Sequence, residues 1–198
     1  MSKGALTRYT ILDHAVGLAS RVGLEGLTIG SLADELELSK SGLFAHFRSK
    51  EALQIQVLDH AAASFVEHVV RPALAQPRGV RRVRALFEYW LEWSHFAPMP
   101  GGCLFVAAAT ELDDRPGPVR DRLQQLQRDW LGVIATSFRK GIEEGHLRSD
   151  ADPDQFAQDL YGVALAYHHA HRLLQDPKAE ARARHAFEAL LFTAQKHT

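Results

Sequence analysis

A segment in the first quarter of the chain carries small and basic side chains where a surface helix normally shows a mixture of Glu and Lys. It reads LSKSGLFAHFRSK, residues 38–50, and its charged side chains are Lys40, Arg48 and Lys50, all basic. Acidic residues also stand just before it, at positions 34, 35 and 37. Because the whole chain has a formal net charge of −1, basic charge is concentrated in this one place, which suits docking against phosphate.

Three predicted helices position this segment. Apolar residues at helical spacing predict a first helix over about residues 7–23, with Gly23 placed to end it. Thr28 can cap a short second helix, and Ser39 can cap the helix that follows the next turn. The apolar side chains expected to pin that third helix to the first two are Leu43, Phe44 and Phe47. Two short helices packed on a longer one are typical of a helix-turn-helix.

The rest of the chain also predicts helices, and no segment has the period-two alternation of a strand. Ser49 can cap a long helix that ends at Arg71-Pro72, and PALAQPRG, residues 72–79, is the one clear linker. Further helices are predicted over about residues 80–95, 103–112, 118–144, 153–174 and 178–194. The predicted fold class is all-α, with an N-terminal three-helix helix-turn-helix DNA-binding domain, 1–52, and a larger helical domain, 53–198.

Composition indicates a folded protein of the reducing cytoplasm. With 46% hydrophobic and 24% charged residues, a chain of 198 residues can bury a core of its own. Cys103 is the only cysteine, so no intrachain disulfide can form. We expect no membrane partner, because no run approaches the ~18 apolar residues of a membrane span and the N-terminus lacks a signal-peptide pattern.

Residues 27–53, LTIGSLADELELSKSGLFAHFRSKEAL, resemble the DNA-binding domain of the tetracycline-repressor (TetR) family. A capping threonine, a turn leucine, Gly42, a His-Phe pair and Lys50 carry the resemblance at the family's spacing. Residues 101–120, GGCLFVAAATELDDRPGPVR, are similar to a stretch in one subfamily of its ligand domains. The resemblance implies a ligand-responsive transcriptional regulator, with repression favoured over activation.

The resemblance also implies which residues meet double-stranded DNA. Gly42 and Ala45 would let the third helix sit close to the groove, where Lys40, Ser41 and His46 can reach base edges. Thr28 and Lys50 occupy positions that the family uses for phosphate contacts. The family usually has Tyr where this chain has Phe44, so a hydroxyl contact to phosphate is missing. The DNA-binding residues predicted in this way are Thr28, Ser39, Lys40, Ser41, Gly42, Phe44, His46 and Lys50.

The aromatic residues of the second domain are spaced as core residues, but in such a ligand domain some would face an unidentified small-molecule effector. Cys103 reads as a buried small hydrophobe or as a redox or electrophile sensor, since Gly101 and Gly102 would leave its sulfur accessible. The candidate ligand-binding residues are Trp90, Cys103, Trp130, Phe138, Tyr167 and His168. We expect no metal and no cofactor.

One short helix makes few base contacts, so the sequence predicts a homodimer whose two copies read a near-palindromic operator about one DNA turn apart, ~34 Å. As the resemblance implies, the last two long helices would pack against their symmetry mates as a four-helix bundle. One alternative is an all-α metal-dependent enzyme that uses His168, His169 and His171. Another is a helix-turn-helix protein that acts through protein partners without a small ligand.

Overall fold

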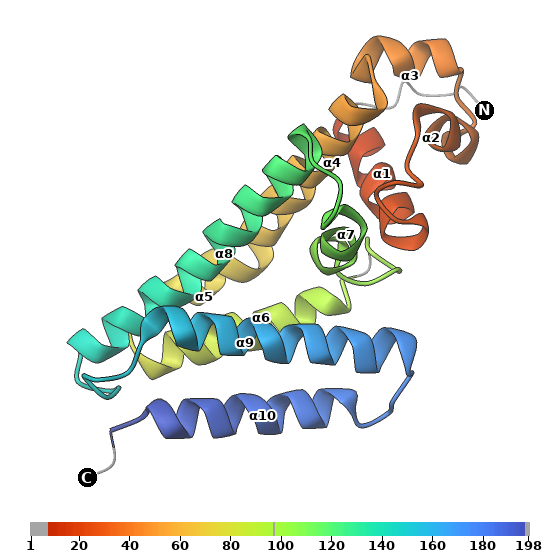
Figure 1. Ribbon diagram of the computed structural model, residues 1–198. Coiled ribbons are helices and arrows are strands. Elements are labelled where there is room, and N and C mark those ends of the chain that lie inside the picture. The colour runs from red at the N-terminus through yellow and green to blue at the C-terminus, as the bar shows by residue number, and fades with distance from the viewer. Residues whose placement is uncertain (1–7, 97, 197–198) are drawn as a thin grey trace. The chain divides into compact units, whose positions relative to one another are not determined.

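The computed structural model describes residues 8–96 and 98–196. Within them there is no strand, only one isolated antiparallel bridge between Leu147 and Gln195, which confirms the predicted all-α class. Figure 1 labels the α-helices, and two short π-helical turns, η1 and η2, continue α4 and α9. In chain order the helical elements are α1 (Arg8–Val22), α2 (Ile29–Leu36), α3 (Lys40–Phe47), α4 (Lys50–Phe65), η1 (Val66–Val70), α5 (Arg71–Ala75), α6 (Val80–Ser94), α7 (Leu104–Leu112), α8 (Pro118–Glu143), α9 (Pro153–His168), η2 (His169–Leu173) and α10 (Ala179–Ala194).

The described residues form two compact units that are discontinuous in sequence. The first lies within Met1–Ser64 and His95–Gln125, and the second within Phe65–Ser94 and Leu126–Thr198. The helix-turn-helix therefore shares its unit with α7 and the beginning of α8, which come from the middle of the chain. These structural units do not test the predicted roles of residues 1–52 in DNA binding and of residues 53–198 in ligand binding and dimerisation, which stay predictions.

The first three helices of the first unit pack around a small apolar core. Gly23 adopts a φ of +82°, a left-handed conformation that ends α1. In α3, Leu43 and Phe47 are each only 1% exposed, as predicted. The expectation that Phe44 also packs inward is wrong, because its residue is 57% exposed. Positions four apart share one face of a helix, whereas adjacent positions point about 100° apart, so Phe44 faces away from the core.

The fourth helix does not stop at Arg71-Pro72, so that sequence prediction is wrong. After α4 the chain passes through the π turn η1 and continues as α5, with Pro72 in its first turn. A proline is tolerated there because its missing N–H has no helical partner in a first turn. The Arg71 N–H still donates to the Val66 carbonyl across the π turn. The helical stretch ends at Ala75, so the connection before α6 is shorter than the predicted linker.

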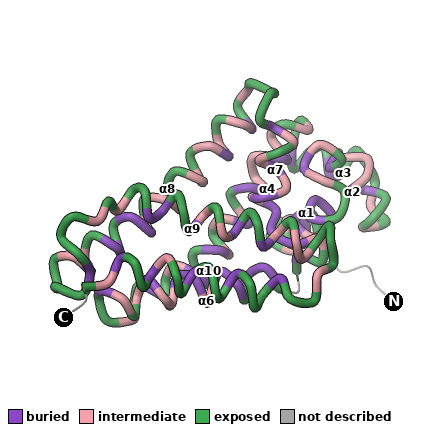
Figure 2. The backbone as a smooth tube through the Cα atoms, turned by 60° about the horizontal axis from the view of Figure 1, so that its bottom comes forward, coloured by how far each residue is buried: buried purple, intermediate pink, exposed green. Residues whose placement is uncertain are grey.

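The second unit is built on aromatic packing between helices. Phe87 of α6 stacks on Phe187 of α10 with ring centroids 4.1 Å apart, and Phe138 of α8 stacks on Phe156 of α9 at 4.3 Å. The helices α9 and α10 lie side by side in this unit (Figure 1). Figure 2 shows buried residues alternating with exposed ones along these helices, as amphipathic helices require.

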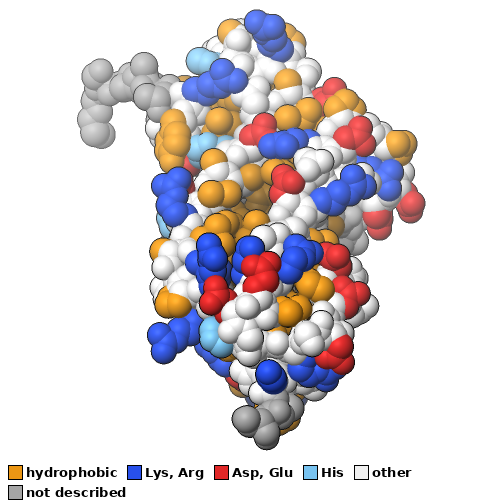
Figure 3. All heavy atoms as spheres, turned by 90° about the vertical axis from the view of Figure 1, so that its left-hand side faces the viewer, with side chains coloured by type: hydrophobic (Ala, Val, Ile, Leu, Met, Phe, Trp, Pro, Cys, Tyr) orange, Lys and Arg blue, Asp and Glu red, His pale blue; other side chains and the backbone are white. Residues whose placement is uncertain are grey.

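Charged side chains of both signs are mixed on the molecular surface. On the face drawn in Figure 3, Lys and Arg side chains are interspersed with Asp and Glu, and hydrophobic side chains lie between them. This pattern fits the formal net charge of −1. Among the described residues, no helix combines the length and the apolar character that crossing a bilayer would require.

Candidate nucleic-acid interface and ligand cavity

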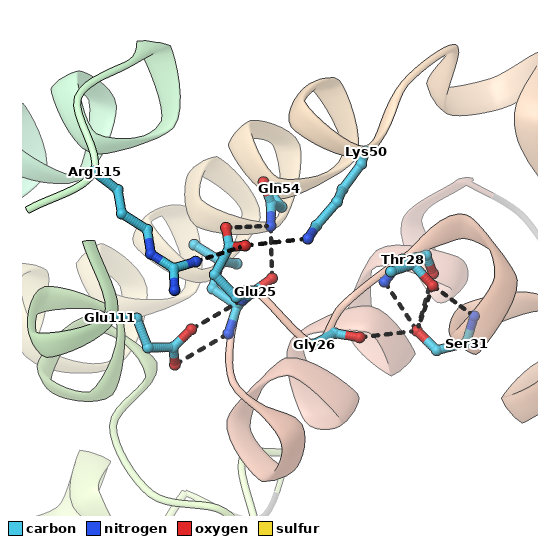
Figure 4. Close-up of polar contacts among 9 residues, drawn as sticks. Glu25, Gly26, Thr28, Ser31, Lys50, Gln54, Glu111 and Arg115 are labelled. Atoms are coloured by element: carbon cyan, nitrogen blue, oxygen red, sulfur yellow. Dashed lines mark hydrogen bonds and ion pairs between the residues drawn. The ribbon is translucent and has the colours of Figure 1, made fainter.

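The beginning of α2 is fixed by a capping box. Thr28 is the N-cap, its Oγ1 accepts a hydrogen bond from the Ser31 N–H at 2.9 Å, and the Ser31 hydroxyl accepts one from the Thr28 N–H at 2.9 Å (Figure 4). Two N–H groups that a helix start leaves without partners are thereby satisfied. The predicted capping role of Thr28 is confirmed, and its side chain is half-buried.

The beginning of α3 is fixed in the same way by Ser39. The Ser39 Oγ accepts from the Gly42 N–H at 3.2 Å, and the Ser41 hydroxyl donates to the same oxygen at 3.4 Å. A Cβ atom at Gly42 would lie 3.1 Å from the Ser39 Oγ, closer than most side chains tolerate. Glycine therefore lets the cap close tightly, in addition to presenting little bulk to the outside.

Six of the eight predicted DNA-binding residues lie exposed along or just before α3, and we call them the α3 surface. Its residues are Ser39, Lys40, Ser41, Gly42, Phe44 and His46. The helix α3 contains no acidic residue. A short helix with hydrogen-bonding groups, one basic side chain and no carboxylate on its outer side is suited to a DNA groove, because the phosphates repel acidic groups.

Lys50 is placed differently from the α3 surface. Its Nζ lies 3.2 Å from Oε2 of Glu25, a residue of the α1–α2 connection. The same Glu25 oxygen lies 2.9 Å from Nη1 of Arg115, and the Gln54 amide donates to the other carboxylate oxygen at 3.4 Å. Figure 4 shows these three donors around one carboxylate. Sequence analysis missed this cluster, because Glu25 and Arg115 are too far apart in the chain for any local pattern to connect them.

An aromatic cavity lies within the second unit, between α6, α8 and α9. It is lined by Phe87, Trp90, Trp130, Ile134, Leu160, Tyr161 and Ala164. Its volume is about 10 Å³, which is the space of roughly one water molecule. Two of the predicted ligand-binding residues, Trp90 and Trp130, are thus brought together. The other five lining residues were not predicted, and one of them, Tyr161, is polar: its hydroxyl donates to the Gln127 side chain at 2.5 Å.

Tyr167 and Phe138, two further predicted ligand-binding residues, are not among the residues that line the aromatic cavity. The Tyr167 ring meets Trp90 edge-on with centroids 5.7 Å apart, and the Ser94 hydroxyl lies 3.3 Å from the Tyr167 hydroxyl. Burial raises the pKa of Tyr167, although the bond with Ser94 acts against this, so the ring stays neutral. Phe138 is fully buried against Phe156 and is not among the residues that line the aromatic cavity.

His168 stands at the end of α9 and is half-buried. Burial lowers the pKa of its imidazole, and the charge of Arg172 and the neighbouring His171 and His169 lower it further. Within 8–96 and 98–196, no three His, Cys, Asp or Glu side chains gather into a group that could hold a metal ion. The alternative of a metal-dependent enzyme built on these histidines gains no support from this geometry.

Cys103 lies in the first unit, whereas the other predicted ligand-binding residues lie in the second. It is only 3% exposed, so the expectation that neighbouring glycines leave its sulfur accessible is wrong. Gly101 serves close packing instead, because a Cβ atom there would lie 1.6 Å from the Ser20 carbonyl oxygen. The Gly101 N–H also donates to the Ser20 hydroxyl at 3.0 Å. Cys103 therefore behaves as a small buried hydrophobe.

A capped helix-turn-helix with an exposed, acid-free third helix, in a chain with a larger helical unit, defines the class of DNA-binding regulators. The profile of the tetR family of bacterial regulatory proteins matches residues 11–57. The profile described as tetracyclin repressor-like, C-terminal domain, matches residues 79–187. The chain therefore belongs to the TetR family, and it is a DNA-binding transcriptional regulator.

Individual relatives agree with this assignment. The HTH-type transcriptional repressor NemR of Escherichia coli (strain K12) is 26% identical over 161 residues, which cover 80% of each chain. A TetR transcriptional regulator from Chloroflexus aurantiacus J-10-FL has the same fold with a TM-score of 0.82 at 26% identity, over 96% of this chain and 94% of that one. AibR, solved in complex with isovaleryl coenzyme A and operator DNA, superposes with a TM-score of 0.72 at 21% identity, over 92% and 97% of the two chains.

Proposed function

We propose that the protein is a cytoplasmic repressor that binds a near-palindromic operator as a homodimer and is released by a small molecule, acting through binding rather than catalysis. The observation that carries the proposal is the α3 surface, on which hydrogen-bonding side chains are exposed around a helix without a carboxylate. We assign base contacts to Lys40, Ser41 and His46, and phosphate contacts to Thr28 and Lys50. Ser39 and Gly42 bring the helix start close to the duplex, and Phe44 offers an apolar surface to a thymine methyl group.

The proposal of a homodimer is supported by the exposed side of α9 and α10. Phe192 on α10 is 62% exposed and Leu165 on α9 is 41% exposed, so each of the two helices carries a large apolar side chain that a second copy of the chain could cover. Gly162 on α9 has no atom within 4 Å of the position its Cβ would take. An apolar face with small residues permits close packing of symmetry-related helices.

The proposal of ligand release rests on the aromatic cavity. It is apolar apart from Tyr161, and its volume of about 10 Å³ is too small for an effector, so an effector would have to bind an expanded conformation of α6, α8 and α9. Such a ligand shifts the protein toward that conformation only by its difference in affinity for the two states. The AibR structure contains isovaleryl coenzyme A and operator DNA. Acyl compounds are therefore the first set of effectors to test. Trp90 and Trp130 would contact the effector.

Binding measurements with selected DNA test the proposed interface. Selection from random duplexes supplies the operator, and fluorescence anisotropy at several salt concentrations then gives affinity and salt dependence. We expect Lys50→Ala to weaken binding to operator and random DNA alike and to lower the slope of log K against log salt by about 0.9, the value for one phosphate. Lys40→Ala should also relax the sequence preference.

A matched control separates these effects from a general loss of positive charge. Lys140 on α8 belongs to the second unit and forms an ion pair with Glu143 at 2.7 Å, so Lys140→Ala makes the same chemical change at a residue that is not part of the α3 surface. It should leave affinity and salt slope unchanged. Selection that yields no preferred duplex, or a Lys40→Ala protein with unaltered sequence preference, would contradict the proposed interface.

A ligand screen tests the second half of the proposal. Trp130 lines the aromatic cavity, so an effector that enters it should change tryptophan fluorescence and also release the operator at the same concentration. Because Trp90 lines the same cavity, Trp130→Phe and Trp90→Phe should each remove part of the fluorescence response. A compound that releases DNA with no change in fluorescence or thermal stability would place its site outside the aromatic cavity.

A further inference from the structure

Glu25 lies at the centre of a cluster of polar side chains from three segments of the first unit (Figure 4). Its Oε2 atom is shared by two cations, with Lys50 Nζ at 3.2 Å and Arg115 Nη1 at 2.9 Å. Gln54 donates to its Oε1 atom at 3.4 Å. Lys50 and Gln54 belong to α4, whereas Arg115 follows α7. One carboxylate thus joins the beginning of α4 to the α7–α8 connection.

The backbone that carries Glu25 is firmly held. The carboxylate of Glu111 on α7 accepts from the Leu24 N–H at 3.2 Å and from the Glu25 N–H at 2.9 Å. Gln54, which is 3% exposed, donates to the Leu24 carbonyl at 2.7 Å. A Cβ atom at Gly23 would lie 2.6 Å from Glu111 Oε1, so glycine admits this carboxylate. The Glu25 side chain is therefore presented to Lys50 from a fixed position.

Lys50 has two possible anionic partners once DNA approaches. Its side chain is 42% exposed, so its ammonium can reach solvent and a phosphate. The Glu25 carboxylate and a DNA phosphate are both negative, so they repel each other when both approach the Lys50 ammonium. The two anions therefore compete for Lys50. If Lys50 moves to the phosphate, Glu25 keeps Arg115 and Gln54 as partners and is not left as an isolated charge. The exchange therefore costs little more than the loss of one partly exposed ion pair.

Glu25 is ionised at neutral pH. Burial acts to raise the pKa of its carboxyl group, but the hydrogen bond and charge of Lys50, together with Gln54 and Arg115, outweigh it and lower the pKa. The carboxylate thus carries its full charge under the conditions in which the protein binds DNA.

We propose that Glu25 is an internal competitor of DNA phosphate for the Lys50 ammonium, so that it sets the affinity of the regulator for DNA. Arg115 acts as a positioning residue: by sharing the Glu25 carboxylate, it weakens the hold of Glu25 on Lys50. Glu111 holds the Glu25 backbone, so that a displacement of α7 within this unit changes how strongly Lys50 is retained. This inference rests on the phosphate contact of Lys50 proposed above.

The test is a double-mutant cycle measured by anisotropy with a fixed operator duplex. Glu25→Gln keeps the shape of the side chain and removes its charge. We expect it to tighten DNA binding by about two- to fivefold, the range that partly exposed ion pairs support, with the largest gain at low salt. In a Lys50→Ala background the same change should give no more than the gain of the control below.

Glu35→Gln is the matched control. Glu35 on α2 pairs with Arg21 at 2.5 Å and belongs to a different ion pair from Lys50, so the substitution removes one negative charge without touching the cluster. It should give a smaller gain that is equal in both backgrounds. Melting temperatures of all variants check that the fold persists.

Arg115→Gln keeps the proposal testable if Glu25→Gln does not fold. Without Arg115, Glu25 holds Lys50 more strongly, so DNA binding should weaken in the wild-type background and change much less with Lys50→Ala. Loss of the Arg115 charge alone would also weaken DNA binding, so the dependence of the effect on Lys50 is what is specific to competition.

Three outcomes would overturn the competition. In the first, Glu25→Gln gains equally with and without Lys50, and in the second it gains no more than Glu35→Gln. In the third, a folded Glu25→Gln protein binds DNA more weakly, which would mean that Glu25 orients Lys50 toward DNA. In all three, Lys50→Ala alone would still lower the salt slope. If Lys50→Ala leaves the slope unchanged, the phosphate contact itself fails, and with it the basis of the competition.

Discussion

The α3 surface and the aromatic cavity are built from different kinds of contact. The hydrogen bonds that cap α2 and α3 join Thr28 to Ser31 and Ser39 to Gly42, residues three positions apart. The aromatic cavity is instead closed by side chains from α6, α8 and α9, which are distant in the chain. A DNA-reading helix thus has its geometry set mainly by its own sequence, whereas a ligand cavity depends on how several helices pack. The first should tolerate changes elsewhere in the protein better than the second.

The largest effect on stability should come from a substitution on the buried side of α3, compared with one on its exposed side. Phe47→Ala removes a ring that is 1% exposed and should lower the free energy of unfolding by about 3–5 kcal/mol. Phe44→Ala removes an exposed ring and should change it by less than about 0.5 kcal/mol, although it should weaken DNA binding. Urea denaturation and anisotropy measure the two effects. Similar losses of stability in both variants would mean that Phe44 is packed in solution.

Filling the aromatic cavity should have the next largest effect. Ala164→Leu adds three heavy atoms to a space of about 10 Å³, so it should lower the free energy of unfolding by about 1–3 kcal/mol through overpacking. Ala63→Leu makes the same change at an exposed position of α4 and serves as the control. Thermal denaturation of both variants measures the difference. A stabilised Ala164→Leu protein would show that the unliganded cavity is larger in solution.

A smaller effect is expected at the cap of α2. Thr28→Ala removes the acceptor of the Ser31 N–H and should cost about 1 kcal/mol in the free energy of unfolding. Thr28→Ser retains the hydroxyl and should restore most of the stability. Equal values for the alanine and serine variants in urea denaturation would argue that the capping hydrogen bond contributes nothing.

The smallest effect should come from the pH dependence of His168. Its pKa is lowered from 6.5 in the folded protein, first by burial and then by Arg172 and its histidine neighbours, so the unfolded chain binds the proton more readily. This group therefore supports the fold fully above about pH 6.5 and loses that support as the pH falls through its folded pKa. His168→Gln should show a shallower fall in stability on acidification between pH 7.5 and 5.5. Identical slopes in the two proteins would contradict the lowered pKa.

Much of the fold was predictable because helix boundaries are local. Gly23, Thr28 and Ser39 act at the helix ends where the sequence analysis placed them, and α9 begins at Pro153 as predicted. Failures came where a residue's type was compatible with two environments. Phe44 is apolar yet exposed, and Pro72 stands in the first turn of α5, where the helical stretch continues rather than stops.

The amino-acid sequence by itself determined the helices, their caps, the acid-free α3 and the family to which the chain belongs. The physical reason is that caps and amphipathic periodicity involve residues within one or two turns of each other. Only the tertiary structure decided that Cys103 is buried, that Trp90 and Trp130 line one nearly filled cavity, and that Lys50 meets Glu25 and Arg115. These contacts join distant segments, and burial or an ion pair exists only once packing has brought its partners together.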